Sequence, residues 1–137
     1  MDAAVVERFE LYVQALVDGR VNDAEVMTIA SPKTGEAGNR RALAAMSRSF
    51  RERNLAPAVI DAKASDDCAL VLIAVKNPQT QKPLLRGFYV MRQQDEWKML
   101  GYNISAFAEM LSNEQRKRFI ALSDWANTRA DSFSPGD

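Results

Sequence analysis

The stretch from Ala58 to Tyr102 constrains the fold of this chain more than any other part of the sequence. It contains four apolar or alternating segments that are separated only by short polar connections. Connections this short favour antiparallel neighbours, because a parallel pair needs a crossover of about a dozen residues or more. The stretch therefore predicts an antiparallel meander of four strands, expected at residues 58–63, 68–76, 84–92 and 97–102.

The second of these segments, Cys68 to Lys76, is apolar on both faces. Because side chains alternate along a strand, Leu70 and Leu72 belong on one face while Val71 and Ile73 belong on the other. Such a pattern is typical of a central strand that is covered on both sides. The sequence therefore predicts a cover for each face of the sheet.

The residues before the sheet have helical periodicity. Apolar side chains recur at every third or fourth position from Val5 to Val17, and Asp2 is placed to cap the helix that they predict. Asp18-Gly19 should end this helix, because glycine readily adopts the left-handed conformation that follows a last turn.

Two further helices are expected before the sheet. Asn22 and Glu25 have the spacing of a capping box and predict a short second helix that reaches about Ala30. A loop should cover residues 31–38, and a third helix should run from about residue 39 to residue 53. The third helix is rich in arginine, which indicates a solvated face or, as the less favoured alternative, a phosphate-binding face.

About thirty residues follow the last expected strand. Ser112 and Gln115 form a second capping box, and the helix that they begin has Phe119, Leu122 and Trp125 on one edge. These side chains are too apolar to remain together in water, so they should dock on the sheet of the same chain or on a second copy. Residues 1–131 are expected to form a single domain, with a disordered tail at 132–137.

Composition excludes several classes of function. The 18 basic and 18 acidic residues of this 137-residue chain cancel, so neither nucleic acid nor an anionic membrane is expected as a partner. The longest apolar run, eight residues from Cys68, is too short to cross a bilayer, and no leader is recognisable at the start. The chain has no histidine and one cysteine, so no metal or cofactor is expected. Cytoplasm and periplasm fit this composition equally.

Three short motifs occur in a recognisable order around the helices and the meander. They are Val17–Ala24 between the first two helices, Asp66–Val71 entering the second strand, and Asp95–Met99 entering the fourth. Together with the order of elements, they resemble the NTF2-like superfamily, including its SnoaL-type and lumazine-binding-like branches. The resemblance implies a sheet curled around the first helices, an apolar cone-shaped cavity, and often a dimer through the outer face of the sheet. The thirty residues after the fourth strand depart from that pattern.

Asp61 is the only acid well inside an expected strand. Strand periodicity places it on the same side as Val59 and Lys63. Members of the family that are enzymes have an acid inside the cavity, and a carboxylate on an apolar wall there would have a raised pKa and act as a base. The alternative is a solvent-facing side chain beside Lys63.

Four side chains are candidates for binding a ligand. Tyr12, Tyr89 and Trp97 have amphipathic rings that can line a cavity and hydrogen-bond a ligand, with core packing as the alternative. Arg86 begins the third strand and is suited to meet an anionic ligand at a cavity mouth, with simple surface exposure as the alternative. Cys68, at the head of a buried strand and without a histidine to activate it, is expected to be a core residue.

Two hypotheses for function remain. The first is a non-catalytic NTF2-like module, monomeric or homodimeric, that binds a small apolar ligand or a protein partner in or around a cone-shaped cavity. The second is a small SnoaL-type lyase or isomerase that uses Asp61 and a cavity tyrosine. The absence of histidine and the scarcity of inward-facing acids favour the first hypothesis.

Overall fold

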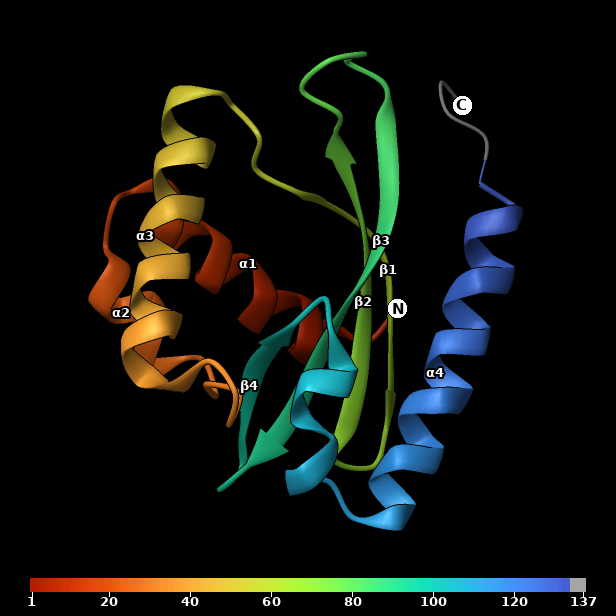
Figure 1. Cartoon of the computed structure of the whole chain (residues 1–137). Coiled ribbons are helices and arrows are strands. Elements are labelled where there is room, and N and C mark those ends of the chain that lie inside the picture. Colours follow the sequence, from red (N-terminus) through yellow and green to blue (C-terminus); the bar gives the residue numbers. More distant parts are fainter. Residues whose placement is uncertain (134–137) are drawn as a thin grey trace.

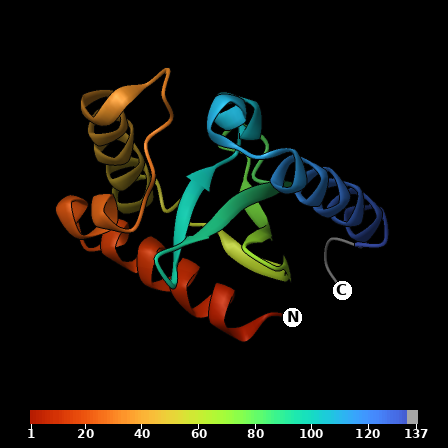
Figure 2. The ribbon, with the colours of Figure 1, turned by 90° about the horizontal axis from the view of Figure 1, so that it is seen from below.

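A computed structural model describes residues 1–133 of the chain, and these residues form an α+β fold, as predicted. Figures 1 and 2 show a twisted sheet with helices on both sides. Within the described range the elements are, in order, α1 (Ala3–Val17), α2 (Val21–Val26), α3 (Gly35–Glu52), β1 (Ala58–Ser65), β2 (Cys68–Lys76), β3 (Pro83–Gln93), β4 (Glu96–Gly101), the 3-10 helix η1 (Ile104–Met110) and α4 (Asn113–Asp131).

The sheet is the predicted meander, with the strands in the order β1-β2-β3-β4 and every neighbouring pair antiparallel. β2 lies between β1 and β3, and its first six residues are buried. Val71 and Ile73 belong to the core beneath α1, whereas Leu70 and Leu72 belong to the core beneath α4. The prediction of a central strand covered on both sides is therefore confirmed.

Helices α1, α2 and α3 cover one face of the sheet, which we call the cavity face. The carboxylate of Asp2 accepts a hydrogen bond from the Val5 amide at 3.1 Å, so the predicted cap of α1 is confirmed. Phe9 and Leu16 are buried against the sheet. The Ser47 hydroxyl of α3 donates to the Leu16 carbonyl at 2.6 Å, which ties α3 to the end of α1. α3 therefore packs on α1 and α2 rather than directly on the strands (Figure 1).

Helix α4 and η1 cover the opposite face, which we call the α4 face. Phe119 and Leu122 of α4 are buried, and Phe107 of η1 joins them. Both hydrogen bonds of the capping box between Ser112 and Gln115 are present, so α4 begins where the sequence predicts. The expected docking on the sheet of the same chain is confirmed, and α4 occupies the face through which the resemblance implied a dimer.

The predicted bounds of two helices are wrong. α2 begins after Arg20, without the side-chain cap expected from Asn22, and ends at Val26 rather than near Ala30. It ends early because Thr28 forms a bridge with Met99 of β4, which extends the backbone there. α3 begins at Gly35, inside the loop expected at 31–38, since the Ser31 hydroxyl accepts from the Thr34 amide at 3.1 Å and starts the turn that precedes the helix.

Two irregularities in the sheet change which side chains share a face. The register between β1 and β2 shifts between Val59 and Asp61, so these two residues lie on opposite faces rather than on one. The register between β3 and β4 shifts beside Leu100, and Gly101 has a φ of +117°. This bulge places Tyr102 on the cavity face, whereas regular alternation predicts it on the same face as Leu100.

The tail predicted to be disordered begins at residue 132. Residues 132 and 133 continue from α4, with the Phe133 amide donating to the Ala130 carbonyl at 3.1 Å. The rest of the tail predicted to be disordered, residues 134–137, lies outside the described residues. Among residues 1–133 no helix is long and apolar enough to cross a membrane, and no group of three potential metal ligands occurs.

Candidate functional site

A cavity of about 180 Å³ separates α3 from the sheet on the cavity face. It exists because α3 packs on α1 and α2, so that its inner side faces the end of β4 without touching the strands closely. Its walls are mainly apolar and carry no charged side chain. The lining residues are Tyr12, Thr28, Asn39, Ala42, Leu43, Met46, Phe88, Met99, Leu100, Gly101 and Tyr102.

Tyr12 supplies the most deeply buried polar group of this cavity. The residue is 3% exposed and packs its ring against Phe9 and Phe88. Its hydroxyl has no hydrogen-bond partner among residues 1–133. Every fully buried side-chain oxygen or nitrogen in this range does have a partner, so the Tyr12 hydroxyl is not fully buried. The hydroxyl must therefore reach solvent-accessible space, and the cavity is the space that Tyr12 lines. Burial, followed by the influence of Tyr102, raises the pKa of Tyr12 well above its ordinary value, so it remains a protonated donor.

The floor of the cavity holds a short polar chain between α2 and α3. The Asn39 amide nitrogen donates to the Thr28 hydroxyl at 2.9 Å, and this hydroxyl donates to the Glu25 carbonyl at 2.7 Å. These bonds fix the orientation of the Asn39 side chain, because its nitrogen is the donor. Its carbonyl oxygen consequently remains available as an acceptor.

Arg86 does not line the cavity itself but lies against Tyr102, which does. It is two residues from Phe88 along β3, so it shares the cavity face, and its guanidinium carbon is 4.1 Å from the centroid of the Tyr102 ring. Burial raises the pKa of Tyr102, and the charge of Arg86 opposes that rise. The predicted residue Arg86 is thus linked to the cavity by its contact with Tyr102. Tyr102 was not among the residues predicted from the sequence.

The other two predicted ligand-binding residues lie away from the cavity. Tyr89 is on the α4 face, where its hydroxyl is 2.6 Å from the Ser123 hydroxyl and its ring meets Phe119 edge-on. Trp97 is on the cavity face but does not line the cavity; it packs at the edge of the core, with the Arg92 guanidinium 5.5 Å from its ring centroid. Of the four candidates, Tyr12 lines the cavity and Arg86 contacts one of its lining residues, Tyr102.

Asp61 faces α4 and not the cavity, so the hypothesis that it is a base on an apolar inner wall is wrong; it lies beside Lys63 and is partly exposed, which agrees with the alternative. Its carboxylate accepts from the Arg129 guanidinium at 3.1 Å, and Lys63 on the same side lies over the Trp125 ring at 5.9 Å. The register shift in β1 directs it there. Asp61 and Tyr12 consequently lie on opposite faces of the sheet, so no acid–tyrosine pair of the kind required by the lyase hypothesis forms in the cavity.

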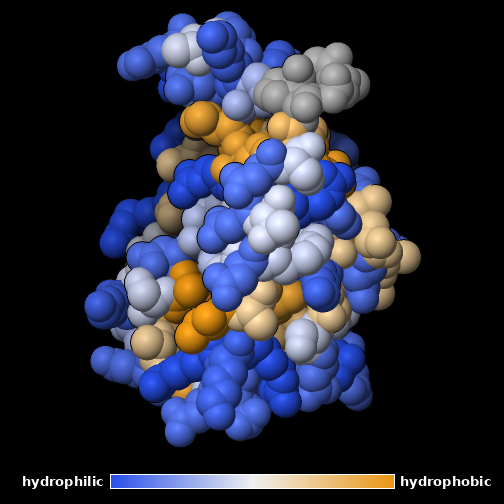
Figure 3. Space-filling model, turned by 90° about the vertical axis from the view of Figure 1, so that its right-hand side faces the viewer, coloured by the Kyte–Doolittle hydropathy of each residue, from blue (hydrophilic) through white to orange (hydrophobic). Residues whose placement is uncertain are grey.

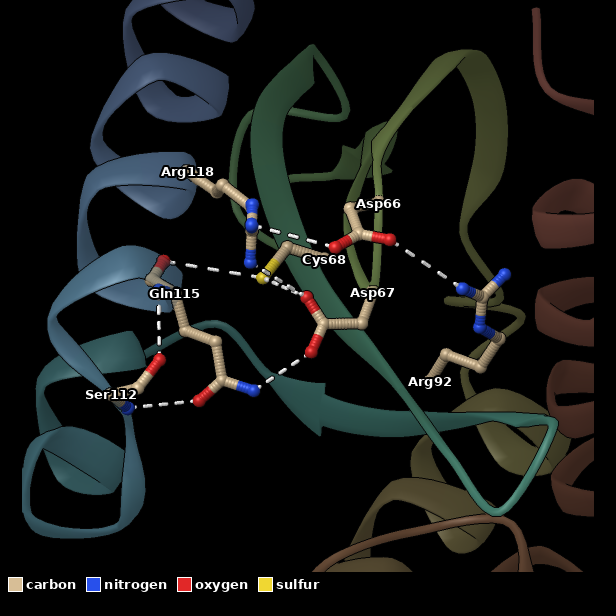
Figure 4. A network of polar contacts seen from close by, with 7 residues as sticks. All are labelled: Asp66, Asp67, Cys68, Arg92, Ser112, Gln115 and Arg118. Atoms are coloured by element: carbon tan, nitrogen blue, oxygen red, sulfur yellow. Dashed lines mark hydrogen bonds and ion pairs between the residues drawn. The ribbon is translucent and has the colours of Figure 1, made fainter.

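The turn between β1 and β2 is linked to the start of α4 by a polar network (Figure 4). Asp67 accepts hydrogen bonds from Gln115 at 2.9 Å and from Arg118 at 3.2 Å, and Asp66 pairs with Arg118 and Arg92. Burial tends to raise the pKa of Asp67, but the hydrogen bonds from Gln115 and Cys68 outweigh it and hold the pKa below its ordinary value. This network fastens α4 to the sheet.

Cys68 lies inside this network as a core residue, as the sequence suggested. It is fully buried, and burial together with the charge of Asp67 raises the pKa of the thiol to about 12. A thiol with so high a pKa carries almost no thiolate at neutral pH, so it is a poor nucleophile.

A second concave surface, which we call the α4 groove, lies between η1 and α4. It has a volume of about 300 Å³ and is almost entirely apolar, with Leu111 and Phe119 at its floor and Ile120, 63% exposed, at its edge. Figure 3 shows hydrophobic side chains gathered beside an otherwise mostly hydrophilic α4 surface. No predicted site residue lines this groove.

Sequence reasoning missed Tyr102, Thr28 and Asn39 as cavity residues. A signal for Tyr102 exists in Gly101, because a glycine inside a strand often marks a bulge that changes the face of the residues after it. Thr28 and Asn39 meet only because α2 ends early and α3 begins early, and no local pattern indicates this.

No protein-family model, curated protein or solved structure gives a significant match to this chain.

Proposed function

We propose that this protein is a binding module that holds a small, largely apolar molecule in the cavity between α3 and the sheet. The observation that carries the proposal is Tyr12, a residue that is 3% exposed and whose hydroxyl lacks a hydrogen-bond partner among residues 1–133 and is accessible from the cavity that Tyr12 lines. A ligand group that accepts a hydrogen bond from this hydroxyl contributes about 0.5–1.5 kcal/mol to binding.

The size and lining of the cavity define the ligand. An apolar cavity of about 150 Å³ accommodates benzene, so the 180 Å³ found here suits one ring with a small substituent. Phe88, Leu43 and Met46 offer apolar contact to such a ring, while Tyr12 and Asn39 offer hydrogen bonds. Few polar groups among apolar walls are typical of small-molecule sites.

The proposed module is NTF2-like and non-catalytic. The three motifs and the order of elements support the resemblance, and a cavity between the first helices and the sheet is what that family leads one to expect. Against the lyase alternative stands the position of Asp61, which is paired with Arg129 on the other face. A protein partner remains the second candidate, favoured by the apolar α4 groove.

Benzamide is a suitable neutral probe, because it has one ring and one group that both donates and accepts hydrogen bonds. We expect it to bind saturably in an NMR titration and to shift the amide signals of Leu43 and Gly101, which line the cavity. Ala42→Phe should block this binding, because Ala42 lines the cavity from α3. Ala45→Phe is the matched control, since Ala45 is exposed on the same helix and is not a lining residue.

Two results would overturn the proposal. One is the absence of any saturable shift at the solubility limit of benzamide. The other is equal binding by Ala42→Phe and Ala45→Phe, which would locate the probe elsewhere on the protein. Shifts confined to residues of η1 and α4 would favour the α4 groove instead.

A further inference from the structure

We propose that the natural ligand of the cavity is a small monocarboxylic acid, with its ring or short apolar body inside the cavity and its carboxylate beside Tyr102, against Arg86. This inference rests on the proposed function and adds the charge and the orientation of the ligand. It follows from the charges that surround the cavity and from the hydroxyl groups inside it.

The first observation is that Arg86 is a cation without a counter-charge. Among residues 1–133, no carboxylate lies within ion-pair distance of its guanidinium, which lies over the Tyr102 ring with its carbon 4.1 Å from the centroid. Two other arginines of the helices on the cavity face are paired: Arg40 of α3 with Glu25 at 3.4 Å, and Arg8 of α1 with Glu96 at 3.9 Å. The surface beside Tyr102 is therefore positive at Arg86.

The second observation is that the cavity itself offers no charge to oppose an anion. All of its lining residues are neutral, so the field of Arg86 extends into an apolar space where it is screened less than in water. A cationic ligand is disfavoured for the same reason. A neutral ligand would leave the guanidinium unused.

The third observation is that two tyrosine hydroxyls are available as hydrogen-bond donors. Neither the Tyr12 nor the Tyr102 hydroxyl has a hydrogen-bond partner within the described part of the chain, and both pKa values are raised, mainly by burial. Both rings line the cavity and pack against Phe88, with ring centroids 5.7 Å and 5.2 Å away. Two protonated phenols and a guanidinium can all donate to the oxygens of a carboxylate, and no lining residue carries a negative charge that would repel it.

The stacking of Arg86 on Tyr102 also favours a carboxylate over a phosphate monoester. A planar guanidinium held over an aromatic ring presents its edge, and that edge pairs with the two oxygens of a carboxylate. A single guanidinium balances one negative charge, whereas a phosphate monoester carries more than one at neutral pH. A small monoanion with an apolar body therefore fits the site best.

Benzoate and benzamide provide the test, because they are nearly the same in shape and differ in charge. In NMR titrations at pH 7, we expect the wild-type protein to bind benzoate about tenfold more tightly than benzamide, which corresponds to about 1.4 kcal/mol. Arg86→Gln should abolish this preference while benzamide binding is retained. Arg86→Lys should keep part of it, because lysine preserves the charge but loses the planar edge.

Arg48→Gln is the matched control, since Arg48 is an exposed arginine of α3 that neither lines the cavity nor forms an ion pair within residues 1–133. It makes the same change in net charge and should leave the preference for benzoate intact. Raising the ionic strength should weaken benzoate binding and leave benzamide binding unchanged. The chemical-shift spectrum of each variant checks that it is folded.

The outcomes separate the two proposals. If neither compound binds, the proposed function fails and this inference fails with it. If both bind with equal affinity, the cavity is a ligand site but the ligand is not selected as an acid. If Arg86→Gln still prefers benzoate tenfold, the carboxylate is held by another group and the role of Arg86 is wrong.

Discussion

The two faces of the sheet are covered in different ways. On the α4 face, polar groups are partnered: Tyr89 meets Ser123, Asp61 meets Arg129, and the Asp67 carboxylate is held by the start of α4. On the cavity face, the Tyr12 hydroxyl has no partner among residues 1–133 and α3 stands away from the strands. The difference indicates that polar contacts contribute to stability on the α4 face, while the cavity face keeps a hydroxyl without a partner among these residues, as the proposed function requires.

The largest effect expected on the α4 face is the loss of a buried aromatic ring. Phe119 is 2% exposed and packs against Tyr89, so Phe119→Ala should lower the free energy of unfolding by about 3–5 kcal/mol. Trp125→Ala should cost clearly less, about 1–2 kcal/mol, because Trp125 is only half-buried. Urea denaturation measures both values.

Because α4 docks within its own chain, neither loss should depend on protein concentration. A midpoint that moves with concentration would indicate that the α4 face is completed by a second copy. An equal loss of unfolding free energy for the two variants would contradict the structure, in which Phe119 is more deeply buried than Trp125.

The next effect concerns the polar link between the turn and α4. Asp67→Asn should destabilise the protein at pH 7 by about 1–2 kcal/mol, since the charged acceptor for Gln115 and Arg118 is lost and the site is partly exposed. Asp95→Asn is the control, because Asp95 is a turn carboxylate without an ion pair among the described residues, and it should change stability by less than about 0.5 kcal/mol.

The sign of the pH dependence follows from the lowered pKa of Asp67. Its folded pKa lies below the ordinary value of 3.8, so the contribution is fully present above that value. It is lost as the pH falls through the folded pKa. Urea midpoints measured between pH 7 and pH 2 should therefore converge for the wild type and Asp67→Asn at the acidic end; parallel curves would show that the carboxylate is not stabilised by α4.

The smallest effect compares one hydroxyl on each face. Tyr89→Phe should cost about 1 kcal/mol, because it removes the hydrogen bond with Ser123. Tyr12→Phe should be neutral or slightly stabilising, because the Tyr12 hydroxyl forms no hydrogen bond within residues 1–133 that the change could remove. Thermal unfolding of the two variants side by side checks this. A larger loss for Tyr12→Phe than for Tyr89→Phe would reverse the distinction between the faces.

Local patterns in the sequence determined the order of elements, the central place of β2 and the docking of α4. Each depends on short-range periodicity: alternation in the strand from Cys68, the capping box at Ser112 and the apolar edge that begins at Phe119. These patterns can be read from the chain because a strand repeats every two residues and a helix every 3.6. Because β2 has apolar side chains on both faces, the sequence also determines that each face must be covered, but not by which element.

Only the tertiary structure decided which side chains meet at the cavity. Regular alternation fails where the register shifts, so Asp61 does not share a face with Val59, and Tyr102 turns toward the cavity rather than to the side of Leu100. A bulge depends on how a strand follows the twist of its neighbours, and this is not encoded in a local repeat. The cavity itself results from α3 resting on α1 rather than on the strands, which is a balance of packing among elements far apart in sequence.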